Sequence, residues 1–179
     1  MDGTLFSNRS LWTMFHGIAL SGGALAGLAI ALFSLTAMRP TTPPGVEERQ
    51  PRALAALLTG TAVALWLAVL VGTYIVFPLY RAAPPPDAVS LQAYPRALLL
   101  ADPDTAWLHA FAMESKEHMP WIAAMLVTAA AFVGVHYRST VLSDAPLRRM
   151  LIVLVAVSFV LTSFVGLLGI LVNKVAPLE

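Results

Sequence analysis

Residues 105–136 read TAWLHAFAMESKEHMPWIAAMLVTAAAFVGVH. The first half of this stretch holds two histidines, two glutamates and a lysine, and the second half is an apolar run that ends at another histidine. A helix needs about 20 residues to cross the roughly 30 Å hydrocarbon layer of a membrane, and this stretch is long enough. Charged groups at the edge of a membrane are expensive unless a partner or a function keeps them there. The stretch therefore predicts both a membrane span and a candidate site.

The composition of the whole chain agrees with a membrane protein. Apolar residues make up 58% of the chain and charged residues 12%, whereas soluble domains carry about 25% charged residues. The net charge of +1 gives no indication of nucleic-acid binding. Because the chain has no cysteine, disulfides, iron–sulfur clusters, thiolate zinc sites and c-type haem are excluded. Any metal must be bound by His, Met or carboxylate groups.

Four apolar segments predict the fold. We expect an all-α integral membrane protein in which four transmembrane helices form an up-down bundle, with a longer Pro-rich loop between the second and third helices. The whole chain, residues 1–179, forms one domain in this interpretation. The predicted spans cover residues 11–38, 53–80, 114–136 and 147–172, and residues 105–113 form an outer helical extension of the third span.

Prolines mark the connections between the spans. Residues 39–52 form a Pro- and charge-rich loop, because proline cannot continue a helix. Residues 82–104 form the longest connection, in which residues 90–100 suit a short amphipathic helix on the surface. Asp102 to Thr105 has the pattern of a capped helix start, with acidic charge at the positive end of the helix dipole.

Two features inside the spans concern helix geometry. Gly23 and Gly27 are four residues apart in the first span, a spacing that lets a neighbouring helix approach closely. Pro120 either opens a new helix or kinks a continuous one in the third span. The first span has an apolar run much longer than that of a cleavable signal peptide, so we expect it to be retained.

The distribution of basic residues predicts the orientation. The loops after the first and third spans hold six basic residues and the opposite side holds five, which favours cytoplasmic placement of those two loops. Both chain ends then face outward, and the inner membrane of a bacterium is the expected location. The six are Arg39, Arg49, Arg52, Arg138, Arg148 and Arg149, and the five are Arg9, Arg81, Arg96, Lys116 and Lys174.

Counting residues along each span predicts a polar layer near the outer face. Twenty residues back from His136 the count reaches Lys116, and twenty back from Met38 it reaches Ile18, so His16 and His118 lie at nearly the same depth. The other spans bring further polar groups to this level. The candidate layer contains His16, Tyr74, Arg81, Glu114, Lys116, Glu117, His118, Asn173 and Lys174.

One chemistry for this layer is a haem b whose iron is ligated by His16 and His118. Haem needs two imidazoles from different helices and small residues that admit the macrocycle, and glycines lie close to His16. A second chemistry is a quinone-binding niche. A quinol needs one group that takes its proton and one that hydrogen-bonds its oxygen, and a histidine beside Glu114 or Glu117, with Tyr74 near, provides both.

Two further alternatives remain open. A metal site could be built from Glu114, Glu117, His118 and His109, although one helix rarely supplies a full coordination sphere. The polar layer could instead be an ion-paired interface of an accessory or scaffolding subunit, in which Lys116 pairs with Glu114 or Glu117, and Lys174 or Arg81 takes the other carboxylate. A transporter is disfavoured, because the middle of every span is apolar.

The functional expectation is a small membrane subunit of a respiratory or electron-transfer complex, whose outer polar layer binds haem b or contacts quinone. No residue has the pattern of a catalytic group, so the chain is not expected to be an enzyme on its own. Its expected partners are membrane lipid, other membrane subunits and a periplasmic redox protein, and no nucleic acid. The cofactor-binding candidates are His16, Tyr74, Arg81, Glu114, Glu117, His118 and Lys174, of which His16 and His118 are the candidate haem-iron ligands.

Overall fold

The computed structural model describes residues 5–38 and 49–178, in which every regular element is helical. Residues 39–48 of the predicted Pro-rich loop lie outside the described residues, as do residues 1–4. Four helices among the described residues are long and apolar enough to cross a membrane, which confirms the four predicted segments. They are Asn8–Ala37, Arg49–Tyr80, Pro103–His136 and Ala145–Val175. We refer to them as the first to fourth long helices.

The first two long helices each contain a π-helical segment. The first consists of α1 (Asn8–Met14), the π-helix η1 (Phe15–Gly22) and α2 (Gly23–Ala37). The second consists of α3 (Arg49–Val71), the π-helix η2 (Gly72–Val76) and α4 (Phe77–Tyr80). Because α3 starts at Arg49, the predicted loop at 39–52 ends earlier than expected and the second long helix is longer than predicted.

The third and fourth long helices are uninterrupted. α6 (Pro103–His136) contains Pro120 in its interior, so the two options for this proline are resolved in favour of one continuous helix. The predicted start is confirmed, because the side chain of Asp102 accepts a hydrogen bond of 2.9 Å from the backbone N–H of Asp104. α7 (Ala145–Val175) begins in the same way, because the side chain of Asp144 accepts a hydrogen bond of 3.0 Å from the backbone N–H of Leu147.

Each long helix packs against two others. α2 contacts α3 and α7, and α6 contacts the same two helices, so the first and third long helices lie diagonally opposite each other. Small residues permit the close approach of α2 and α3, since a Cβ on Gly27 would collide with Thr61. Gly23, its predicted companion, has open space within 4 Å in the described structure. The main apolar core is built from leucine, alanine and valine side chains of all four helices.

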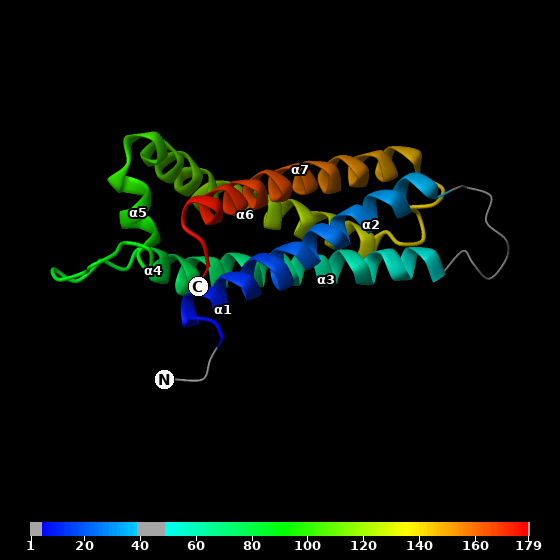
Figure 1. The fold of residues 1–179 in the computed structure, drawn as a ribbon. Coiled ribbons are helices and arrows are strands. Elements are labelled where there is room, and N and C mark those ends of the chain that lie inside the picture. Colours follow the sequence, from blue (N-terminus) through cyan, green and yellow to red (C-terminus); the bar gives the residue numbers. More distant parts are fainter. Residues whose placement is uncertain (1–4, 39–48, 179) are drawn as a thin grey trace.

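One end of the molecule carries additional structure. The short helix α5 (Pro95–Ala101) lies across this end, beside α4, the start of α6 and the C-terminal residues (Figure 1). It overlaps the surface helix expected at residues 90–100, but it begins five residues later and ends one residue beyond that range. Leu99 of α5 is fully buried in a second apolar cluster, together with Tyr80 of α4 and Leu108 of α6. We call this end of the molecule the α5 end.

Candidate functional site

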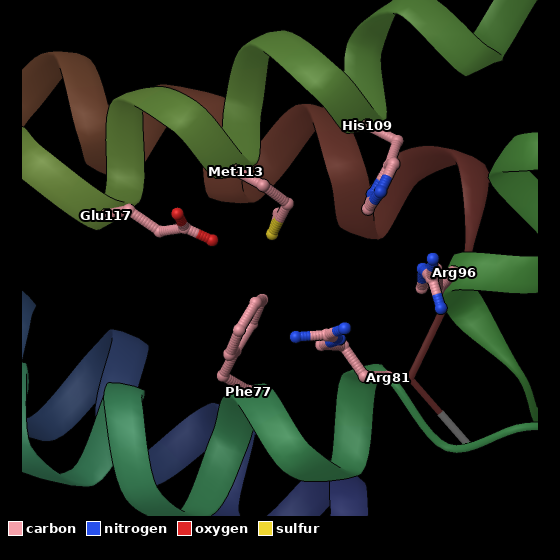
Figure 2. Close-up of a pocket in the computed structure, with 6 residues that line it drawn as sticks. All are labelled: Phe77, Arg81, Arg96, His109, Met113 and Glu117. Carbon is pink, nitrogen blue, oxygen red and sulfur yellow. The ribbon is translucent and has the colours of Figure 1, made fainter.

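A pocket of about 200 Å³ opens at the α5 end, between α4, α5 and α6. The third long helix supplies three of its residues at intervals of four, which places them on one face of α6. Side chains from the three elements point into a common space (Figure 2). The lining residues are Phe77 and Arg81 from α4 and its end, Arg96 from α5, and His109, Met113 and Glu117 from α6.

Glu117 lies at one end of this pocket, and Arg81, Arg96 and His109 lie toward the other (Figure 2). The guanidinium of Arg81 lies 5.2 Å from the ring centre of Phe77, a cation–π contact that holds the arginine at the pocket wall. Arg81, Arg96 and Glu117 all act electrostatically on His109. Within residues 5–38 and 49–178, Glu117 forms no ion pair or side-chain hydrogen bond. The pocket thus offers two guanidinium groups, an imidazole and a free carboxylate.

A tyrosine fixes the imidazole in the pocket. The hydroxyl of Tyr80 lies 2.6 Å from Nδ1 of His109, and the two rings stack with their centres 5.8 Å apart. Tyr80 is buried in the second apolar cluster, so its own position is well defined. When the hydroxyl donates to Nδ1, the neutral ring carries its proton on Nε2. His109 then presents an N–H donor in a fixed orientation.

A second polar group, the imidazole of His16, lies between the first and second long helices. The imidazole of His16 packs against η2, where a Cβ on Gly72 would lie 2.8 Å from its Cε1 atom. The ring lies near the backbone of Ala68, and its Nδ1 atom is buried without a hydrogen-bond partner among the described residues. Ser21 donates a 2.8 Å hydrogen bond to the carbonyl of His16. This bond satisfies a carbonyl within η1.

Lys116 of α6 reaches toward the fourth long helix. Its Nζ atom lies 3.3 Å from the position that a Cβ on Gly169 would occupy, and its charge acts on the imidazole of His16. No carboxylate in the described part of the chain forms an ion pair with Lys116. All four long helices therefore contribute to this place, two with basic side chains and two with glycines. We call His16 and Lys116 the interior pair.

The structure divides the predicted polar layer into separate groups. It brings Arg81 and Glu117 together in the pocket, and it places His16 in the interior. Tyr74 is 70% exposed, and Lys174 is also exposed.

His118 and Glu114 lie on the outward face of α6. Their side chains are 66% and 78% exposed, with His118 Nδ1 3.7 Å from a carboxylate oxygen of Glu114. Nδ1 also lies 2.9 Å from the carbonyl oxygen of Glu114. Lys116 and His118 are two residues apart, about 200° around an α-helix. Since Lys116 faces the interior, His118 faces away from it, and the structure does not bring His16 and His118 to a common space.

Six contributors to these two places were not among the predicted site residues. They are Phe77, Tyr80, Arg96 and Met113 at the pocket, and Gly72 and Gly169 beside the interior pair. Tyr80 and Arg96 are separated by the long connection, so only its folded path brings them together. The adjacency of Tyr80 to Arg81 at a helix end was the available signal for Tyr80. No sequence signal marks the two glycines.

The remaining alternatives were a metal site and an ion-paired layer. No three His, Asp or Glu side chains in the described ranges converge as a metal site would require. In the part of the chain that the structure describes, Lys116 forms no ion pair with Glu114 or Glu117. Neither Lys174 nor Arg81 forms an ion pair with either of these carboxylates there.

A comparison of the chain with known protein families, with characterised proteins and with solved structures finds no match.

Proposed function

We propose that the chain is an integral membrane protein in which the four long helices form an up-down bundle. The support is the presence of four helices of suitable length and hydropathy and their pairwise packing. In this proposal the α5 end faces the outer side of a bacterial inner membrane, with both chain ends on that side, as the distribution of basic residues favours. The pocket then lies at the outer interface of the membrane.

We further propose that the chain is a subunit of a respiratory or electron-transfer complex and contacts quinone through the pocket. The observation that carries this proposal is the meeting of an exposed carboxylate, Glu117, with Arg81, Arg96 and His109 in one pocket. A quinone needs hydrogen-bond donors at its two carbonyl oxygens, which the guanidinium groups and His109 supply. The quinol form needs a proton acceptor, which the carboxylate supplies. Phe77 and Met113 provide apolar contact for the ring.

The size of the pocket favours a single-ring head group. Its volume of about 200 Å³ is below the roughly 300–1,000 Å³ of pockets that enclose drug-sized ligands. A quinone ring fits such a space if its isoprenoid tail remains in the lipid, whereas a porphyrin does not. Haem ligation is not part of the proposed function, because the exposed side chain of His118 points away from the helix interior in which His16 lies.

Equilibrium binding of decylubiquinone to the purified protein in lipid nanodiscs tests the proposal. We expect saturable binding, and we expect Arg81→Gln and Arg96→Gln each to weaken it by about 10- to 100-fold, the loss of one charged hydrogen bond. Arg138→Gln is the matched control, since Arg138 is an exposed arginine two residues beyond the C-terminal end of α6, whereas the pocket residues of α6 lie in its N-terminal half. Absence of saturable binding would favour the alternative, an accessory subunit without a ligand.

A further inference from the structure

We propose that one end of the pocket, formed by Arg81, Arg96 and His109, binds the phosphate group of an anionic phospholipid. We call these three residues the arginine end of the pocket. The phosphate and the quinone need the same guanidinium groups, so the lipid competes with quinone and regulates its access. This regulatory role rests on the proposed function, whereas the phosphate site itself requires no quinone.

The hydrogen-bond donors at the arginine end exceed what a quinone can use. Each guanidinium group carries five N–H donors. The contact of Tyr80 with Nδ1 of His109 leaves the Nε2 atom of this ring available to the pocket. A quinone carbonyl oxygen has two lone pairs and no net charge. A phosphodiester has two free oxygens that share a negative charge, and arginine binds such oxygens in a bidentate manner. The donor set therefore suits a phosphate group.

The charge of the pocket lining supports the same ligand. The lining contains two arginines and one glutamate, so its net charge is +1 when the imidazole is neutral. Within residues 5–38 and 49–178, no carboxylate forms an ion pair with Arg81 or Arg96. Glu117 lies at the other end of the pocket (Figure 2). A neutral quinone leaves the positive charge uncompensated, whereas a phosphodiester carries one negative charge and compensates it.

Contacts with aromatic rings hold the arginine end in place. The Cζ atom of Arg81 lies 5.2 Å from the ring centre of Phe77, and stacking of this kind leaves the edge of the guanidinium free for hydrogen bonds. His109 is fixed by Tyr80, with ring centres 5.8 Å apart. Arg96 is partly buried on α5. Donors that are held in place before binding lose less conformational entropy when a ligand arrives.

The location of the pocket favours a lipid over a soluble phosphate compound. The proposed topology places the α5 end at the membrane interface, which is the level of lipid phosphates. Tyr74 and Trp107, close in sequence to the pocket residues, are 70% and 60% exposed, and such side chains are typical of that interface. Phe77 and Met113 add an apolar wall that a soluble phosphate does not need. The volume of about 200 Å³ admits a phosphate group, while the acyl chains remain in the membrane.

Equilibrium binding to the purified full chain in dodecylmaltoside micelles, followed by native mass spectrometry, tests this inference. The probes are phosphatidylglycerol, diacylglycerol with the same acyl chains, and glycerol 3-phosphate. We expect saturable binding of phosphatidylglycerol, at least about tenfold tighter than that of diacylglycerol, because only the former carries a phosphate. Arg81→Gln and Arg96→Gln should each weaken phosphatidylglycerol binding by about tenfold or more. Arg138→Gln, the control, should leave it within about twofold.

Glu117→Gln separates the phosphate site from quinol binding. This variant removes a negative charge from the far end of the pocket, so it should strengthen phosphatidylglycerol binding by at least about twofold. For a quinol the same variant removes the proton acceptor and should weaken binding. Glu114→Gln is the matched control, because Glu114 is an exposed glutamate of the same helix outside this pocket. Phosphatidylglycerol should also raise the apparent dissociation constant of decylubiquinone as its concentration rises.

Three results would overturn parts of the proposal. Equal binding of phosphatidylglycerol and diacylglycerol to the wild-type protein contradicts a phosphate site, and this comparison does not depend on the folding of a variant. Binding of glycerol 3-phosphate as tight as that of phosphatidylglycerol contradicts the assignment to a lipid. Lipid binding without competition contradicts the regulatory role. Because the lipid titrations contain no quinone, their failure is distinct from a failure of the pocket to bind decylubiquinone.

Discussion

The hydroxyl oxygen of Tyr80 lies 2.6 Å from Nδ1 of His109, and this contact joins the end of the second long helix to the third. Tyr80 also stacks on Phe77, with ring centres 6.4 Å apart. The two contacts make Tyr80 the residue that links the aromatic wall of the pocket to its imidazole. The order of the pocket depends on this hydroxyl, which itself does not line the cavity.

Tyr80→Phe should therefore weaken the pocket without removing the aromatic packing. The loss of one buried hydrogen bond is expected to lower the free energy of unfolding by about 1 kcal/mol and quinone affinity by about 2- to 10-fold. Thermal unfolding and decylubiquinone binding measure the two effects. Tyr74→Phe, at a tyrosine that is 70% exposed, is the control. Equal behaviour of the two variants would show that the Tyr80 hydroxyl has no role.

Gly72→Ala should disturb His16. A Cβ at this position would lie 2.8 Å from Cε1 of the imidazole, and overpacking of this kind costs about 1–3 kcal/mol. Gly60→Ala is the matched control on the same long helix, because a Cβ on Gly60 would meet no described atom within 4 Å. There the alanine is expected to be neutral or to stabilise the helix by up to about 1 kcal/mol. Unfolding in mixed detergent micelles compares the two, and equal stability would contradict the close packing of His16.

Lys116→Met should stabilise the protein. Methionine has a similar length, and it removes a mostly buried positive charge that has no carboxylate partner among the described residues. We expect a gain of at least about 1 kcal/mol in the free energy of unfolding. Lys174→Met, at an exposed position, should change it by less than about 0.5 kcal/mol. A clear loss of stability in Lys116→Met would mean that the lysine is paired in the native protein.

His118→Ala should leave quinone binding within about twofold of the wild type, because this side chain is 66% exposed and lies outside the pocket. The same variant tests the haem prediction. Ligation by His16 and His118 requires a Soret band in the purified protein that His16→Ala and His118→Ala each abolish, and that His136→Ala leaves intact. A reduced-minus-oxidised spectrum without this band contradicts haem binding.

The sequence predicted the helices well because their length and apolar composition depend on local residues. The helix start at Asp102 was predicted for the same reason, since a cap is a local interaction. Depth counting also placed His16 and Lys116 near one level. It could not give the direction of a side chain around its helix, and for this reason it grouped His118 with His16 although it is Lys116 whose charge acts on that ring.

Other parts of the candidate site depend on contacts that are distant in sequence. Arg96 reaches the pocket only because α5 folds across the end of the molecule. The π-helices η1 and η2 change the position of His16 relative to Gly72, and an apolar pattern with one helical period does not reveal them. The absence of a partner for Glu117 is likewise a property of the assembled helices.

The comparison of Glu117→Gln with Glu114→Gln in the binding of decylubiquinol, the reduced form whose hydroxyl donates to the carboxylate in this account, tests the central claim most directly. Both residues are glutamates of α6, three positions apart, but only Glu117 lines the pocket with Arg81 and Arg96. The account predicts that Glu117→Gln weakens binding by about 10- to 100-fold and that Glu114→Gln leaves it within about twofold. Equal affinity of the two variants, or the absence of saturable binding to the wild-type protein, would contradict the account.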